Sequence, residues 1–316
     1  MAFQQPNLNR DTTIHNPQGI FHNVMGGHWE ARMEEVQLGK KIGEGAMAMI
    51  YIATLRGRTC VAKKLKQGVD CNSQAYKDLV MELDVMMTVG AHPNLVEFYG
   101  AVIVDPKSPI ILEELVSGPN LESFLQGRAG KALERRTVYG WTLDLLRALD
   151  FLHNRNPIII HRDLKPANMM LSKDLSTVKV ADFGMSKKIN ASERETMVNK
   201  GHTGTLRYMA PEVVAKATAI YNEKADIYSA SIIIWYIATS KRPPLKDKFD
   251  VVGRPDVNSV SWPELGALLQ TMWNGEPNRR PSAQQCVVTL ANMNGKPEIA
   301  EGVAPMADAG CACSVQ

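Results

Sequence analysis

Four side chains that could move a phosphoryl group lie in two short motifs of the chain. The first motif, His161–Asn168, reads HRDLKPAN and supplies the carboxylate of Asp163, the ammonium of Lys165 and the amide of Asn168. A carboxylate can take a proton from a hydroxyl group, and an ammonium can neutralise a phosphoryl group. The second motif, Asp182-Phe183-Gly184, adds a carboxylate. With the amide oxygen of the first motif, it forms a pair of hard oxygen ligands suited to Mg²⁺.

These two motifs resemble the catalytic loop and the metal-binding motif of eukaryotic protein kinases. The resemblance implies an α+β, bilobal protein-kinase fold, with an antiparallel-sheet small lobe, a mainly helical large lobe and ATP between them. It also implies that Asp163 orients the acceptor hydroxyl and that Lys165 neutralises the γ-phosphoryl group. Asn168 and Asp182 would hold Mg²⁺ and contact the nucleotide.

A glycine-rich turn between two predicted strands would cover the phosphates of the nucleotide. Residues 36–66 read as three strands joined by turns, and the first turn contains Gly43 and Gly45. Glycines let a backbone pass close to phosphates and present N–H groups to them. Compared with the kinase pattern, Ala48 replaces the third glycine and Ile50 replaces a valine. Ile42, both glycines and Ile50 are therefore predicted to contact the nucleotide.

The next strand carries two consecutive lysines, and only one of them can face the nucleotide because side chains alternate along a strand. The register of the kinase motif favours Lys64 as the functional lysine over Lys63. In that register Ala62 would cover the adenine together with Ile50. The resemblance assigns Glu82, on a helix predicted over residues 74–89, as the partner of this lysine, and Asp84 is the alternative register.

The segment from Pro109 to Val116 reads as a buried strand that leads into the hinge between the lobes. Counting back from Ser117-Gly118 places the gatekeeper, the residue behind the adenine, at Glu113. A slip of one residue would place it at Leu112. The backbone groups of Glu114 and Val116 would contact the adenine edge.

Residues 182–212 resemble a kinase activation segment, because they are polar and end in a pattern of the GT..Y.APE type. Thr205 is expected to bond near Asp163 and Lys165, and Glu212 is expected to pair with Arg280. In the family, an arginine at the position of Arg162 binds a phosphorylated activation segment. The candidate phosphorylation sites are Ser192, Thr196 and Thr203.

The composition is that of an ordinary globular protein, with 45% hydrophobic and 22% charged residues among 316. A net charge of +3 and the lack of a basic run give no sign of nucleic-acid binding. The N-terminus has no secretion signal, and the longest apolar run, Ala230–Thr239, is too short to span a bilayer. Five scattered cysteines do not suggest disulfides or a zinc site, so a cytoplasmic protein is expected.

The pattern divides the chain into three parts. Residues 1–33 are predicted to be a poorly ordered arm. Residues 36–294 are predicted to be the kinase domain, with a small lobe over 36–116 and a large lobe over 117–294, and residues 295–316 a flexible tail. The tail ends in Cys-Ser-Val-Gln, which fits the prenylation pattern loosely. A lipid on Cys313 would bring the chain to a membrane surface, and the alternative is an unmodified tail.

Lys165 followed by Pro166 is typical of serine/threonine kinases. The sequence around Tyr208 and Asp226 resembles that of their tyrosine-kinase-like group. The predicted function is therefore transfer of the ATP γ-phosphoryl group to a protein hydroxyl. One alternative is a pseudokinase that serves as a scaffold or binding module. Its support is Ala48 in place of a glycine and the acidic residue Glu113 at the gatekeeper position. The other is a small-molecule phosphotransferase, and the complete activation segment argues against it.

Overall fold

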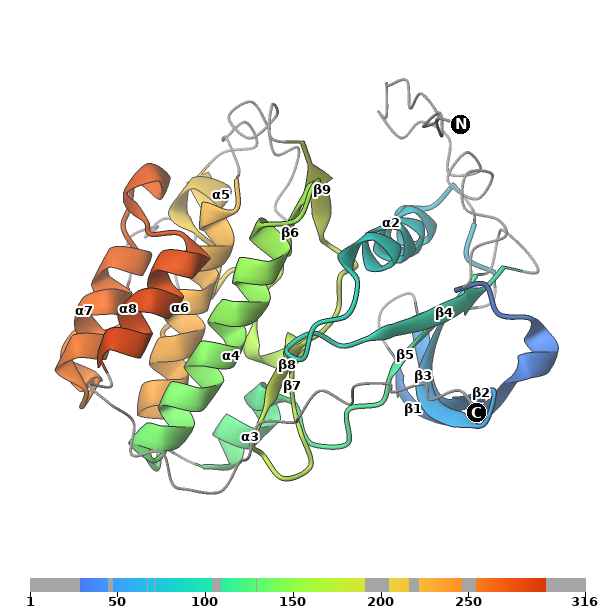
Figure 1. The fold of residues 1–316 in the computed structure, drawn as a ribbon, viewed down its shortest axis with the longest axis horizontal. Coiled ribbons are helices and arrows are strands. Elements are labelled where there is room, and N and C mark those ends of the chain that lie inside the picture. The colour runs from blue at the N-terminus through green and yellow to red at the C-terminus, as the bar shows by residue number, and fades with distance from the viewer. Residues whose placement is uncertain are drawn as a thin grey trace, which may run out of the picture.

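The computed structural model has two lobes, a sheet with one helix and a larger helical part (Figure 1). It describes residues 29–44, 48–66, 68–70, 72–103, 109–128, 130–190, 205–215, 222–245 and 254–293. The predicted two-lobe α+β architecture is thereby confirmed. No helix in these ranges has the length and apolar character needed to cross a membrane.

The small lobe is built on a five-stranded antiparallel sheet with the order β1-β2-β3-β5-β4. Its second hairpin turns through Arg56 and Gly57, both at positive φ (48° and 82°), as a tight two-residue connection requires. One face of the sheet buries small and branched side chains, among them Ala62 and Leu112. The opposite face looks toward the helix of this lobe and toward the large lobe. The strands are β1 (Val36–Glu44), β2 (Ala48–Leu55), β3 (Arg58–Leu65), β4 (Phe98–Val102) and β5 (Ile110–Glu114).

Helix α2 (Gln74–Val89) lies against the sheet and carries the predicted apolar stripe, since Leu79, Leu83 and Met86 are buried. Its first turn is capped by Ser73, whose hydroxyl accepts a hydrogen bond from the backbone N–H of Tyr76 at 3.3 Å. The helix ends at a glycine with positive φ. These features fix both ends of the element that presents Glu82.

The structure describes the last residues of the predicted N-terminal arm, from Trp29 to residue 33. The carbonyl oxygen of Trp29 accepts from Ala101 N–H at 3.0 Å, and Ala31 N–H donates to the oxygen of Ala101 at 2.8 Å. This short segment therefore pairs with the edge strand β4. A Cβ atom at Gly100 would lie 2.4 Å from the carbonyl oxygen of Trp29, so the close approach requires glycine.

The large lobe packs its helices around the mostly buried helix α6. Helix α4 packs against both α6 and α8, and α6 is apolar almost all round, as expected for a central helix. Two small antiparallel sheets, β6-β9 and β7-β8, lie between these helices and the small lobe. The helices are α3 (Leu121–Gly127), α4 (Arg135–His153), α5 (Pro211–Ala215), α6 (Lys224–Thr239), α7 (Pro263–Met272) and α8 (Ala283–Met293); the strands are β6 (Ile158–Ile160), β7 (Met169–Leu171), β8 (Val178–Val180) and β9 (Lys187–Ile189).

Candidate active site

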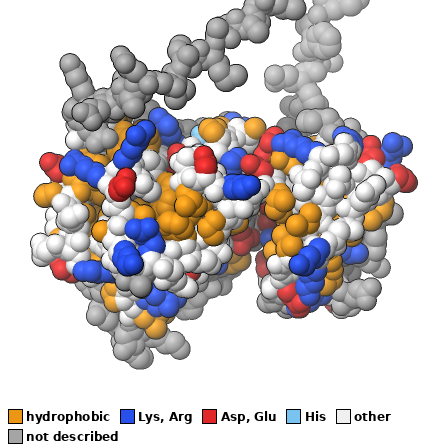
Figure 2. Space-filling view, turned by 90° about the horizontal axis from the view of Figure 1, so that it is seen from below, with side chains coloured by type: hydrophobic (Ala, Val, Ile, Leu, Met, Phe, Trp, Pro, Cys, Tyr) orange, Lys and Arg blue, Asp and Glu red, His pale blue; other side chains and the backbone are white. Residues whose placement is uncertain are grey.

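A cleft of about 750 Å³ lies where the two lobes meet, and Figure 2 shows the hollow between them from one side. The volume is typical of a site for a nucleotide-sized ligand. Both lobes contribute to its lining, which is largely apolar with charged groups converging at one end. Eight residues predicted to contact the nucleotide line this cleft: Ile42, Gly43, Ile50, Glu82, Glu114, Val116, Asn168 and Asp182.

The loop His161–Asn168 follows the buried strand β6 and is held by the carboxylate of Asp226 at the start of α6. The two oxygens of Asp226 accept from the backbone N–H groups of His161 (2.8 Å) and Arg162 (3.0 Å). The Nε2–H of His153 donates to the same carboxylate at 3.0 Å. Burial raises the pKa of Asp226, but these donors outweigh burial and hold it below its usual range. An ionised, buried carboxylate therefore fixes the backbone of the loop.

Asp163 lies in this loop, buried, with both carboxylate oxygens engaged. Thr205 donates to Oδ1 at 3.3 Å, and Lys165 pairs with Oδ2. The amide nitrogen of Asn168 donates to the carbonyl oxygen of Asp163 at 2.9 Å and lies 3.4 Å from its Oδ2. The prediction that Thr205 bonds near Asp163 is thus confirmed. Lys165 and Asn168 of the first motif both contact Asp163 of the same motif.

Asp182 and Asn168 both line the cleft and present oxygen atoms there. Asn168 uses its amide nitrogen on Asp163, so its amide oxygen is the atom left for a ligand. Asp182 adopts a positive φ of 65°, while the next residue, Phe183, is buried in the core. Burial raises the pKa of Asp182, but the charge and hydrogen bond of Lys63 bring it below its usual range. A carboxylate and an amide oxygen form a donor set that fits Mg²⁺.

The lysine that enters the cleft is Lys63, so the prediction of Lys64 was wrong. Lys63 Nζ lies 2.6 and 2.7 Å from the two carboxylate oxygens of Glu82 and 3.2 Å from Asp182 Oδ1. Side chains alternate along β3, and Lys63 faces the cleft in the same register as Val61. Ala62 faces the opposite, fully buried side of the sheet. Val61 therefore lines the cleft in place of the predicted Ala62.

Glu82, which was predicted to pair with Lys64, is the partner of Lys63, and the alternative Asp84 points elsewhere. Asp84 forms an ion pair of 2.7 Å with Lys188 of β9. Burial raises the pKa of Glu82, and the charge of Lys63 is the main opposing influence. For Lys63, burial lowers the pKa, but Glu82, Asp182 and Glu113 together raise it above its usual range, so the lysine stays protonated.

Glu113 lines the cleft, whereas Leu112 packs on the far face of the sheet. Of the two registers left open by the sequence, the structure therefore supports Glu113 as the gatekeeper. In the sheet, Glu113 is the partner of Val61 on β3. Burial and the neighbouring charge of Glu82 raise the pKa of Glu113 to about 8, although Lys63 opposes the shift.

The hinge side of the cleft is fixed by Glu114. Its backbone N–H donates to the carbonyl oxygen of Glu97 at 2.8 Å, and its carboxylate pairs with Lys179 at 2.7 Å. The N–H of Glu114 is thus already used within the protein and is not free for a ligand in the cleft. Val116, two residues further along, also lines the cleft.

The predicted ion pair between Glu212 and Arg280 is confirmed. Arg280 is 2% exposed, and its two terminal nitrogens each lie 2.7 Å from an oxygen of Glu212. The same guanidinium donates to the carbonyl oxygens of Asn274 and Lys224 at 2.8 and 3.0 Å. This pair joins the end of the activation segment to the C-terminal helices. Several predicted positions lie outside the described residues: Gly45, Ser192, Thr196, Thr203 and Cys313.

Sequence reasoning missed two contributors to the site. Asp226 was recognised only as part of a helix start, yet it anchors the catalytic loop. The available signal was an acidic residue at the start of an otherwise apolar helix, because a buried carboxylate requires partners. Val61 was missed because the motif register placed Ala62, and not Val61, on the face of β3 that looks into the cleft.

Comparison with known proteins agrees with this geometry. A family profile described as "Protein kinase domain" matches residues 36–289. Serine/threonine-protein kinases CTR1 and STY46 of Arabidopsis thaliana are 33% and 31% identical to the chain, covering 78% and 83% of it. Serine/threonine/tyrosine-protein kinase HT1 of the same plant is 30% identical over 83% of the chain.

The chain spans 30% of CTR1, 45% of STY46 and 67% of HT1, so these relatives differ in how much sequence lies outside the match. Their names agree with the serine/threonine type that the loop sequence predicts. The family profile covers most of the chain and includes the whole cluster around Asp163 and Lys63. The chain therefore belongs to the protein kinase family.

Proposed function

We propose that the protein transfers the γ-phosphoryl group of ATP to serine or threonine hydroxyls of protein substrates. The observation that carries this proposal is the assembled charge cluster of the cleft. Lys63 bridges Glu82 and Asp182, and Asp182 faces the same cleft as Asn168 of the catalytic loop. In kinases, the lysine–glutamate pair and the metal-binding aspartate must both be in place before phosphoryl transfer occurs.

Each residue has a distinct task in the proposed reaction. Lys63, held by Glu82, positions the α- and β-phosphates. Asp163 accepts a hydrogen bond from the substrate hydroxyl and receives its proton, while Lys165 neutralises charge that develops on the transferred group. Mg²⁺, when bound by Asp182 and Asn168, would neutralise the phosphate oxygens. Because Asn168 and Thr205 both hold Asp163, its carboxylate is oriented before the substrate arrives.

The rival proposal is a pseudokinase, in which the fold serves only for binding. Its support is the acidic gatekeeper, because the carboxyl group of Glu113 lies among the same charged groups as Lys63. Against it, all the residues needed for chemistry are present and mutually oriented.

Incubation with γ-labelled ATP, magnesium and a generic protein substrate, followed by identification of the labelled amino acids, separates the two proposals. Label on serine or threonine that disappears on magnesium chelation supports the kinase. Nucleotide binding without any transfer, even to the protein itself, would support the pseudokinase.

A further inference from the structure

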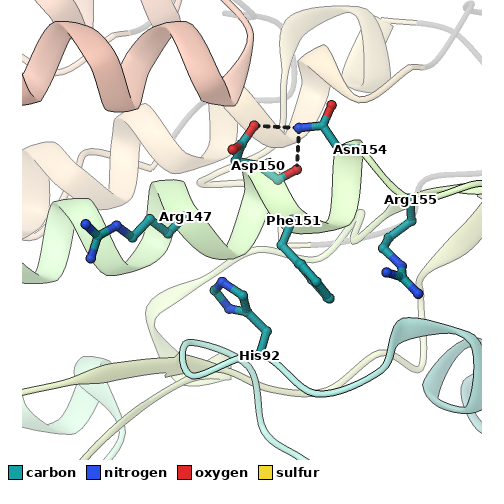
Figure 3. A pocket seen from close by; sticks show the side chains of 6 residues that line it. All are labelled: His92, Arg147, Asp150, Phe151, Asn154 and Arg155. Atoms are coloured by element: carbon teal, nitrogen blue, oxygen red, sulfur yellow. Dashed lines mark hydrogen bonds between the residues drawn. The ribbon is translucent and has the colours of Figure 1, made fainter. Parts of the chain in front are cut away.

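A second pocket, separate from the nucleotide cleft, lies between the loop that follows α2 and the C-terminal end of α4 (Figure 3). Its volume is about 330 Å³, which is enough for one aromatic ring with a charged substituent. None of its lining residues lines the cleft. The lining consists of His92, Arg147, Asp150, Phe151, Asn154 and Arg155.

The charge of this pocket is mainly positive. Arg147 and Phe151 are four residues apart on α4 and therefore share one face of the helix, and Arg155 follows two residues after the helix ends. Figure 3 shows one guanidinium on each side of the Phe151 ring. Asp150 is the acidic residue of the lining, and its carboxylate accepts a hydrogen bond from the side-chain amide of Asn154 at 2.7 Å.

The two arginines are not equivalent. Arg155 stacks over Phe151, with 5.0 Å from its guanidinium carbon to the ring centre, and donates to the carbonyl oxygen of Thr88 at 3.3 Å. Arg147 is exposed, and no ion pair in the described part of the chain includes it, although its charge acts on the carboxylate of Asp144 on the same helix. Arg147 is thus the guanidinium that remains available to an anion.

His92 provides a second donor and part of an apolar floor. Its Nδ1 accepts from the backbone N–H of Asn94 at 3.1 Å, so the ring proton of the neutral form is on Nε2. Burial and the nearby charge of Arg147 lower the pKa of His92, which favours the neutral form of the ring. The ring stacks on Phe151 with 4.7 Å between centres and 27° between planes.

We propose that this pocket binds an organic phosphate monoester. The phosphate oxygens would accept from the Arg147 guanidinium and from the Nε2–H of His92, and the organic part would lie at the part of the Phe151 ring that His92 and Arg155 leave exposed. A guanidinium matches the geometry of phosphate oxygens, and a neutral imidazole N–H adds a directed donor from a different element. The two aromatic rings favour a flat apolar body over a bare ion.

The pocket is connected to the helix that carries Glu82. Arg155 bonds the last turn of α2 through Thr88, and Lys188 contacts both the Thr88 hydroxyl (3.3 Å) and Asp84 (2.7 Å). A ligand that packs beside Phe151 and Arg155 would restrict this turn. Occupancy is therefore expected to slow amide hydrogen exchange over residues 84–89.

The test uses the full chain, with the cleft saturated by magnesium and a non-hydrolysable ATP analogue, and phenyl phosphate as the probe. The matched variants are Arg147→Gln and Arg136→Gln, because Arg136 is an exposed arginine of the same helix outside the pocket. Arg147→Gln is expected to weaken binding by about tenfold or more, since it removes a charge-assisted contact. Arg136→Gln is expected to bind as the unmodified chain does.

Phenol and inorganic phosphate, each tested alone, are expected to bind more weakly than phenyl phosphate. A short phosphotyrosine peptide distinguishes two sources of the same chemistry: tighter binding than phenyl phosphate indicates a phosphopeptide ligand, and weaker binding a small molecule. Equal affinity of Arg147→Gln and the unmodified chain, or no saturable binding, would overturn the site. Unchanged exchange over residues 84–89 in a saturated sample would overturn its link to α2. Neither readout depends on kinase activity.

Discussion

Replacement of Lys63 by methionine keeps a long unbranched side chain, one heavy atom shorter, and removes its charge from the cleft. In the structure this charge lies 2.6 Å from Glu82 and 3.2 Å from Asp182. Loss of one preorganised electrostatic contact to the phosphates is expected to lower the rate of phosphoryl transfer by about 10²–10³-fold or more. Lys63→Met should therefore be nearly inactive at saturating ATP.

The same change also removes the partner of a buried carboxylate. Breaking a buried ion pair costs about 3–5 kcal/mol when the remaining charge stays ionised. Here the cost should fall below that range, because burial already raises the pKa of Glu82 and the group can take up a proton. We expect the variant to fold, with a measurably lower melting temperature.

Lys64→Met is the matched control, because Lys64 is the adjacent lysine on the other face of β3. Initial rates with γ-labelled ATP and a protein substrate, together with thermal unfolding, distinguish the two variants. Lys64→Met is expected to keep the unmodified rate to within about twofold, as a change outside the site should. An inactive Lys64→Met beside an active Lys63→Met would refute the strand register described above.

Three further predictions concern the small lobe. Gly100→Ala should lower the free energy of unfolding by about 1–3 kcal/mol, because its Cβ would lie 2.4 Å from a backbone oxygen. Gly140→Ala in α4 is the control, because nothing lies within 4 Å of a Cβ there, and it should be neutral or stabilising in the same denaturation assay. Glu113→Thr should improve binding of inhibitors that need an apolar back pocket by about tenfold or more, because a smaller side chain without a carboxyl group replaces the polar group at that position; unchanged affinities would contradict the gatekeeper assignment. Since the pKa of Glu113 is raised from 4.5 to about 8, the folded state holds a proton that the unfolded state loses, so stability should fall as pH rises through this window. Urea unfolding at several pH values should show a smaller decrease for Glu113→Gln, and an equal decrease would contradict the shift.

Much of the site could be predicted because kinase chemistry depends on short stretches of sequence. Asp163, Lys165 and Asn168 lie in one loop, so their proximity follows from the chain itself. The pair Glu212 and Arg280 is distant in sequence but was identified from two family motifs, and it is present with a bidentate geometry. The two-lobe architecture followed from the same resemblance.

The errors arose where packing decides which face of a strand a side chain occupies. Two adjacent lysines in β3 cannot be distinguished by composition, and the motif register placed the small residue Ala62 toward the nucleotide. Instead, Ala62 fills the tightly packed face of the sheet beside Cys60 and Leu112, which turns Lys63 into the cleft. The order of Trp29–Ala31 was also not predictable, because it depends on an edge strand far along the chain and on the missing side chain of Gly100.

The most direct test of the central claim compares nucleotide binding with phosphoryl transfer in Asp163→Asn. Asp163 is held by hydrogen bonds from Thr205 and Asn168 and does not line the nucleotide cleft. The account predicts that the variant binds ATP with magnesium as the unmodified protein does, while its single-turnover rate falls by about 10²–10⁴-fold. An unmodified protein that binds ATP but transfers no phosphoryl group, or an Asp163→Asn variant with the full rate, would contradict the account.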